Sequence, residues 1–247
     1  MPPCVRRFER TIPVHVLERE ADLTRTQREG LGKIETLTLL GVAQETTTRI
    51  PATPETDRRI DAVLFVRASL GNTRALESTA TVVHACFPHP SVLILENARG
   101  DVCLSAALTS RRKRATGFAV NAMEADSDIG SWRRTEQGKA FLSSLAFETL
   151  DQRSLAHLTQ DIMARIRLAR VARLVGFYPD PGLCRTPDVV AVIERLLECQ
   201  GRQDRLRARW KAHGTTQRER LRLRIPLSEA IDQTKAAVDE LTRRCGR

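Results

Sequence analysis

The first part of the chain alternates short apolar runs with turn-forming residues, which is typical of a small sheet. Apolar and β-branched residues dominate 34–40 and 61–70, so both segments are predicted strands, the second largely buried. Two further apolar strands are predicted over 91–96 and 102–109. The five residues between them, Asn97-Ala-Arg-Gly-Asp101, predict a hairpin turn.

Two helices are predicted among these strands. Thr24 and Gln27 have the spacing of a capping box, so a short helix should begin there and end near Gly32. Asn72 is a candidate N-cap for a helix through Cys86, where the following prolines prevent its continuation.

A further strand over 116–123 completes the predicted element order, α-β-β-α-β-β-β. This order predicts an α+β (mixed α/β) fold, with a small mixed sheet and flanking helices, over residues 1–135. From about residue 139 onward the apolar period becomes that of a helix. We therefore expect a second, helical region over 139–247.

The helical region shows two apolar stripes separated by a loop rich in proline and glycine, 176–187. The first stripe consists of Leu155, Leu158, Ile162, Ile166 and Ala169. The second begins with Val189, Ile193, Leu196 and Gln200. After them, Arg220-Leu-Arg-Leu-Arg-Ile225 alternates strictly, which indicates a short strand with one basic face or an extended lead into Pro226.

The last segment carries apolar positions at alternating spacings of four and three, which form a heptad pattern. Its members are Leu227, Ile231, Thr234, Val238, Leu241 and Cys245. A partner or a second copy of the chain, in a coiled coil, would cover this stripe through Leu227, Ile231, Val238 and Leu241. The alternative is a single amphipathic helix packed on its own domain, for which the helix at 155–169 is the candidate.

Charge divides the chain more sharply than hydrophobicity does. Residues 1–110 carry 13 basic and 13 acidic side chains, whereas residues 111–247 carry 27 and 17, so the net charge of +10 lies in the second part. Localised positive charge favours phosphate backbones, anionic lipids or acidic protein surfaces. Arginine outnumbers lysine 35 to 5, a bias that a GC-rich genome also produces.

Two basic clusters are the candidate nucleic-acid-binding residues. The first, at a predicted hairpin, is Arg111, Arg112, Lys113 and Arg114. The second consists of Arg202, Arg205, Arg207, Arg209, Lys211, Arg218, Arg220, Arg222 and Arg224. Trp210 lies within it, either as a base-stacking aromatic or, as its spacing from Leu206 favours, as a core residue.

Candidate catalytic and metal-binding residues are few. His84, Cys86 and His89 are of the types that bind zinc, but no second pair stands at ligand spacing. Asp61 and Glu96 are the carboxylates around which a restriction-nuclease-like site would form. Neither Lys33 nor Lys113, the lysines of the first 130 residues, follows an acid at the required spacing.

No phosphate-binding loop, dinucleotide fingerprint or serine-hydrolase elbow occurs in the sequence. We therefore predict no catalytic residues, no metal and no cofactor. The six cysteines show no regular spacing, and no run of 18 apolar residues occurs. A cytoplasmic protein without disulfides or membrane contact is expected.

Several segments, in order, resemble the bacterial family called domain of unknown function 4391. They are 37–51, 61–70, 86–96, 102–108 with the basic residues that follow, Ser131-Trp132, and Gln217 before a basic segment and a last amphipathic helix. The resemblance implies a small protein encoded beside helicases and DNA methyltransferases in anti-phage defence islands. The tryptophan and lysine frequent in relatives near 36–39 are replaced here by Thr-Leu-Thr-Leu.

Three functions are compatible with these patterns. The leading hypothesis is a non-catalytic accessory subunit of an anti-phage defence complex, which binds a helicase-type partner and contacts DNA, without sequence preference, through the basic helical region. The second is a metal-dependent nuclease with a degenerate or rearranged site. The third is a structural coiled-coil homodimer.

Overall fold

The computed structural model describes residues 1–247 except 1–5, 21–22, 54–58, 112–117 and 247. The chain forms two compact units, Met1–Ala169 and Arg170–Arg247. The division falls inside the helix Leu155–Val175. Each unit is described separately below.

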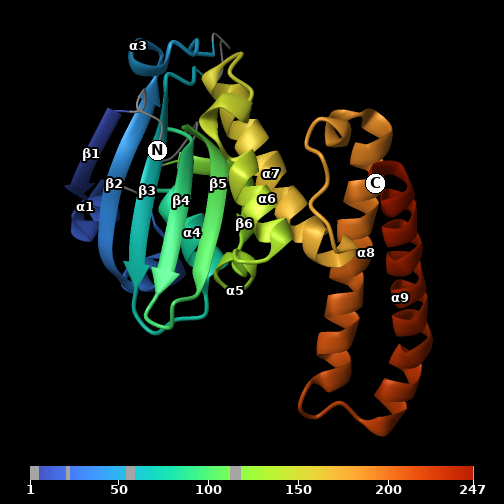
Figure 1. Ribbon diagram of the computed structural model, residues 1–247. Coiled ribbons are helices and arrows are strands. Elements are labelled where there is room, and N and C mark those ends of the chain that lie inside the picture. Colours follow the sequence, from blue (N-terminus) through green and yellow to red (C-terminus); the bar gives the residue numbers. More distant parts are fainter. Residues whose placement is uncertain (1–5, 21–22, 54–58, 112–117, 247) are drawn as a thin grey trace. The chain divides into compact units, whose positions relative to one another are not determined.

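The first unit is built on a six-stranded sheet in which spatial order follows chain order (Figure 1). Neighbouring strands are antiparallel except for β3 and β4, which are parallel and joined by helix α4. The strands are β1 (Arg6–Thr11), β2 (Ile34–Gln44), β3 (Ala62–Leu70), β4 (Ser91–Asn97), β5 (Val102–Arg111) and β6 (Phe118–Asp126). This confirms the predicted α+β class, including the hairpin between β4 and β5.

Short helices connect and flank these strands. They are α1 (Val14–Glu20), α2 (Arg25–Leu31), α3 (Glu45–Thr48), α4 (Leu76–His84), α5 (Ile129–Trp132) and α6 (Glu136–Ser144), with a 3₁₀ turn, η1, at Phe147–Thr149. The capping box predicted at Thr24 is confirmed: the Gln27 amide N–H donates to Thr24 Oγ1 at 3.3 Å, and Gln27 Oε1 accepts from the Thr24 amide at 2.9 Å.

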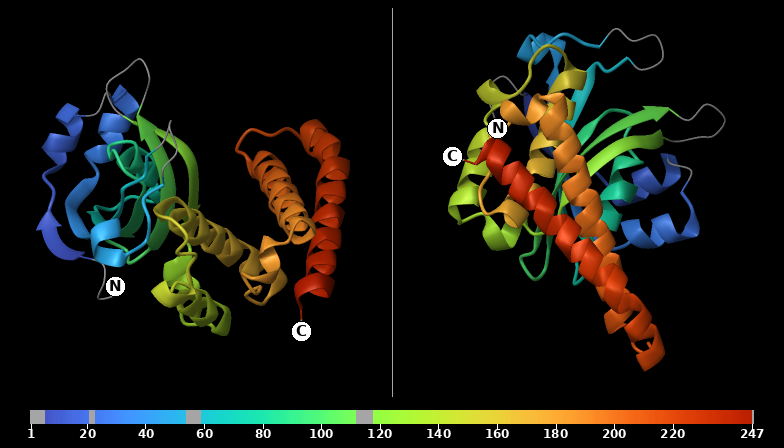
Figure 2. Two further views of the ribbon diagram at one scale, coloured as in Figure 1. Left: turned by 90° about the horizontal axis from the view of Figure 1, so that it is seen from above. Right: turned by 90° about the vertical axis from the view of Figure 1, so that its right-hand side faces the viewer.

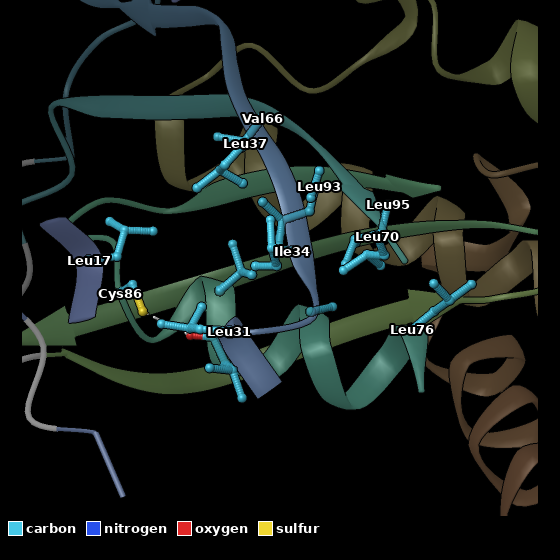
Figure 3. Packing of buried hydrophobic residues seen from close by; sticks show 14 of the residues in the cluster. Leu17, Leu31, Ile34, Leu37, Val66, Leu70, Leu76, Cys86, Leu93 and Leu95 are labelled. Carbon is cyan, nitrogen blue, oxygen red and sulfur yellow. Dashed lines mark hydrogen bonds between the residues drawn. The ribbon is translucent and has the colours of Figure 1, made fainter. Parts of the chain in front are cut away.

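The core of the first unit lies between the sheet and helices α1, α2 and α4 (Figure 3). Leu37, Val66, Leu93 and Leu95 from neighbouring strands are fully buried there. The alternation of apolar and polar residues along β3 explains why one of its faces belongs to this core. The core is aliphatic, as the low aromatic content indicates.

Two details of the first unit differ from the sequence-based prediction. Strand β1 was not predicted, because its sequence, Arg-Arg-Phe-Glu-Arg-Thr, lacks apolar alternation. The expected N-cap at Asn72 is wrong: α4 begins at Leu76, and Asn72 instead accepts a 2.5 Å hydrogen bond from Arg99 Nε. Its side chain thereby secures the β4–β5 turn.

Helix α7 (Leu155–Val175) contributes the predicted apolar stripe 155–169 to the first unit, and all five of its members are buried. A buried ion pair accompanies the stripe: Arg165 Nη2 lies 2.9 Å from Asp161 Oδ2, one helical turn away. Arg165 also donates to the carbonyl oxygens of Ser144 and Thr149. The pair therefore holds the segment after α6 against α7.

The second unit contains a 3₁₀ turn, η2 (Leu183–Arg185), and the long helices α8 (Pro187–Lys211) and α9 (Gln217–Cys245). Our interpretation of 220–225 as a strand or extended segment is wrong, because α9 runs through it and through Pro226. Thr216 starts the helix with a capping box, in which Glu219 Oε2 accepts from the Thr216 amide at 2.9 Å. The hydrogen bonds from the Thr216 amide and hydroxyl lower the pKa of Glu219.

Candidate nucleic-acid interface

Helices α8 and α9 form an antiparallel hairpin (Figures 1 and 2). Ion pairing of Arg195 with Glu240, and a 3.4 Å hydrogen bond from Arg202 Nη1 to Gln233 Oε1, fix which turns lie side by side. The connection between the helices contains Gly214, whose φ of 98° is a conformation that side chains rarely permit. The chain therefore reverses direction within a few residues.

The seam of the hairpin is built from aliphatic residues of α8 and small residues of α9. On α8, Val189, Ile193 and Leu196 are buried, as the predicted stripe requires. On α9 the buried residues are Ala230, Thr234, Ala237, Leu241 and Cys245. Small side chains allow the two helices to approach closely.

The second basic cluster lies on both sides of the hairpin turn, so chain reversal brings its two halves to the same end. We call this set the basic tip; it comprises Arg202, Arg205, Arg207, Arg209 and Lys211 of α8 and Arg218, Arg220, Arg222 and Arg224 of α9. All nine side chains are exposed. The hairpin thus places the two halves of the cluster next to each other.

The charges of the basic tip are largely uncompensated. Its segment, 202–224, contains two acidic residues, Asp204 and Glu219. Asp204 accepts hydrogen bonds from the Gln200 amide, and Glu219 caps α9. Within the described part of the chain, no carboxylate forms an ion pair with any of the nine cations. The nine cations outnumber the two carboxylates of the segment, which leaves a net positive charge for a ligand.

The other end of the hairpin differs, because two of its arginines are paired. Arg195 binds Glu240, and Arg244 lies 2.9 Å from Glu240 and 4.0 Å from Asp188. The two arginines lower the pKa of Glu240. Positive potential is thus concentrated at the tip.

The remaining predicted nucleic-acid contacts are only partly described. Arg111 is the last residue of β5, and the register Arg111↔Phe118 confirms that a β5–β6 connection follows it. Arg112, Lys113 and Arg114 lie outside the described residues, as does the Arg111 side chain. Trp210 is half-buried on α8, so its burial decides neither for a base-stacking aromatic nor for a core residue.

The predicted partner-binding stripe is divided by the hairpin seam. Leu241 is fully buried in the seam, so its assignment to a partner-facing stripe is corrected. Ile231 is 38% exposed, and Leu227 and Val238 are half-buried. These three flank the seam because the smaller Ala230, Thr234 and Ala237 occupy its centre. Within the second unit, α8 covers this face of α9.

The carboxylates of the nuclease hypothesis do not share a site. Strands β3 and β4 are parallel, and Glu96 is paired in register with Ser69, eight residues after Asp61. Eight residues of strand span roughly 26 Å. Each carboxylate also has its own partner: Asp61 Oδ1 lies 3.2 Å from His89 Nδ1, and Glu96 Oε2 lies 2.9 Å from Arg67 Nη2. The pair could not bind one metal ion.

His84 and Cys86 belong to the interior of the first unit. Ser105 Oγ donates to the Glu124 carbonyl at 3.0 Å and so accepts from His84 Nε2 at 2.9 Å, which leaves Nδ1 to accept from Ser91 Oγ at 2.6 Å. Burial lowers the pKa of His84 to about 3 and raises that of Cys86 to about 12. Among the described residues, no three His, Cys, Asp or Glu side chains gather as a metal site would require.

None of the described helices combines the length and apolar character needed to cross a membrane. The fold and the site define an α+β protein with a six-stranded mixed sheet and a helical hairpin with a basic tip. A model of the family described as "Domain of unknown function (DUF4391)" matches residues 3–230, so the chain belongs to this family. No curated protein and no solved structure matches the chain.

Proposed function

We propose that this protein is a non-catalytic accessory protein that binds nucleic acid through the basic tip. The observation that carries the proposal is the set of nine exposed cations, without carboxylate partners among the described residues, at one end of the hairpin. Arginine and lysine bind phosphate oxygens and release counterions from the nucleic acid. Binding through such contacts depends on salt and not on base sequence.

The test is a salt titration of DNA binding, followed by fluorescence anisotropy. Wild-type protein should lose affinity steeply as salt rises. Replacing Arg207, Arg209, Arg220 and Arg222 with Gln should lower the slope of log K against log salt by up to about three, if all four contact phosphates. A control, Arg25→Gln with Arg28→Gln, removes two exposed charges from α2 of the first unit and should change binding little.

Two results would overturn the proposal: no binding of wild-type protein even at low salt, or equal binding by the wild type and the four-residue variant. Supercoiled plasmid incubated with the protein and magnesium or manganese should stay intact. Nicking would contradict the non-catalytic role.

The proposal includes a protein partner of helicase type, within a bacterial anti-phage defence complex, as the family resemblance implies. Its support in the fold is the partly exposed flank of α9 formed by Leu227, Ile231 and Val238, which a partner helix could cover. Native purification should recover a helicase-motif ATPase at fixed stoichiometry. Ile231→Asp should abolish this association while the hairpin stays folded, since Ile231 lies outside the seam.

A further inference from the structure

We infer that one flank of the α8–α9 hairpin is a groove that binds a single strand of nucleic acid, entering from the basic tip. This inference rests on the proposed function and goes beyond it by naming the form of nucleic acid and its path. It is carried by two hollows between the helices, of about 540 and 380 Å³.

The two hollows follow one another along the same flank. On α8 their lining includes Cys199, Arg202, Arg205 and Arg209, at helical spacings of three and four, which place them in one line. On α9 Arg222 lines the smaller hollow and Gln233 the larger. These two are eleven residues apart, about three full turns, so they also project on one side.

The walls of the groove are mainly cationic, and its floor consists of small or apolar side chains. One carboxylate, Glu219, also lines the smaller hollow, where its Oε2 accepts hydrogen bonds from the Thr216 amide and hydroxyl. Arg202, Arg205 and Arg209 line the α8 wall, and Arg222 lines the α9 wall. Arg205 lies back along its helix over Gly201, where a Cβ would be 3.5 Å from its Nη1. Phosphates would contact the arginines, while bases would lie over the floor formed by residues such as Ala236 and Leu223.

The electrostatics of the groove also define where the path ends. Glu198 and the Arg195–Glu240 pair line the larger hollow at the end away from the tip. Carboxylates repel phosphates, so a polyanion is favoured from the tip through the turns that contain Arg202, Cys199 and Ala236, and is disfavoured beyond them, at the Arg195–Glu240 pair.

A trough between two packed helices fits one strand better than two. Helices at a close-packed interface have axes about 8–10 Å apart, which leaves space for a single extended chain. A duplex keeps its bases stacked inside and would contact only the rim of the groove. Single-stranded ligands should therefore bind more tightly than duplexes, without sequence preference.

The first test places a negative charge on the floor of the groove. Ala236→Glu should weaken binding of oligodeoxythymidine by roughly tenfold or more, because it adds a negative charge inside the groove that the polyanion must follow. The matched control, Ala208→Glu, makes the same change at an exposed position of α8 that does not line either hollow. It should cost markedly less, and equal losses in the two variants would overturn the inference.

The second test uses the wild-type chain and a thiol that is already in the groove. Cys199 is half-exposed and lines the larger hollow, whereas Cys86, Cys103, Cys184 and Cys245 are buried. Oligodeoxythymidine should protect Cys199 from alkylation by iodoacetamide, as mapped by mass spectrometry of peptides, and a duplex of the same length should protect it less. Binding of the oligonucleotide without protection of Cys199, or tighter binding of the duplex, would overturn the inference of a single-strand groove. The proposed function would remain intact. Absence of binding to either form would overturn both.

Discussion

Arginine has opposite roles in the two units of this molecule. In the first unit the Arg165 side chain is 4% exposed and is bound to Asp161 and to two carbonyl oxygens. In the hairpin nine cations are exposed, and no described carboxylate forms an ion pair with them. The polar groups of the first unit are thus occupied in holding the fold, while those of the tip remain available to another molecule.

His84 extends this comparison, because histidine is often a catalytic acid or base in enzymes. Here both ring nitrogens are bound to buried serines, and the ring is inaccessible. A reactive residue type is therefore not evidence of a reaction. The environment of the residue decides whether it serves the fold or a ligand.

The largest expected effect is the loss of stability when the Asp161–Arg165 ion pair is broken. Arg165→Met should destabilise the first unit by about 3–5 kcal/mol, because it leaves the Asp161 carboxylate buried without its cation. Urea unfolding can be followed through Trp132, which packs on Phe141 with ring centroids 5.7 Å apart, in a Trp210→Phe background.

The control for this prediction is Arg153→Met. Arg153 forms an ion pair with Asp151 at 2.7 Å, but its side chain is 72% exposed, so its loss should change stability little. Equal effects of the two substitutions would show that the buried pair does not hold the first unit together, and the comparison would fail.

The second prediction concerns acid stability. Burial holds the pKa of His84 at about 3, below its value of 6.5 in the unfolded chain, so the unfolded state binds the extra proton first. The stability associated with neutral His84 is complete above pH 6.5 and is lost as pH falls toward 3, at up to about 1.4 kcal/mol per pH unit.

Unfolding of the first unit at several pH values, followed by Trp132 fluorescence, measures this slope. His84→Gln should lower stability at neutral pH and flatten the slope between pH 6.5 and 5. His213→Gln, in the turn of the other unit, should keep the wild-type slope. An unchanged slope in His84→Gln would mean that folding does not shift the pKa of His84.

The sheet could be predicted from sequence because its signals are local and agree with one another. Strands β3 and β4 are bounded by turn residues, and the Thr24 capping box starts α2 as expected. Strand β1 could not be found, since an edge strand with polar side chains on both faces has no apolar period.

The hairpin was only half predictable. An exposed helix that alternates Arg and Leu has no buried face to show its period, so 220–225 matches a strand equally well. The Thr216–Glu219 capping box was the signal that could have identified the helix. Without that helix, the two halves of the basic tip could not be placed together.

The heptad pattern was only half right, for a different reason. Thr234, Leu241 and Cys245, which it selected, are buried in the seam, but Leu227, Ile231 and Val238, which are large and aliphatic, lie beside it. At the places closest to α8 the seam uses the smaller Ala230 and Ala237 instead. The groove was not predictable at all, because it depends on which turns of α8 and α9 face each other.

The smallest expected effect tests whether the tip cations stabilise or destabilise the hairpin. Arg220 and Arg224 are one turn apart on α9 and both exposed, so they repel each other. Replacing both with Gln, a similarly good helix former, should stabilise the hairpin by about 0.2–0.5 kcal/mol at low salt. High salt should remove the difference by screening.

The hairpin can be followed through Trp210 in a Trp132→Phe background. Arg243→Gln is the control of opposite sign: Arg243 lies in the last turn of α9, where a cation favours the helix dipole, so its loss should destabilise slightly. A polyanion should act like salt and raise the melting temperature of the wild-type hairpin more than that of the Arg220→Gln, Arg224→Gln variant. If that variant were instead less stable at every salt concentration, the tip arginines would be structural, as Arg165 is, and the contrast between the two units would no longer support a ligand at the tip.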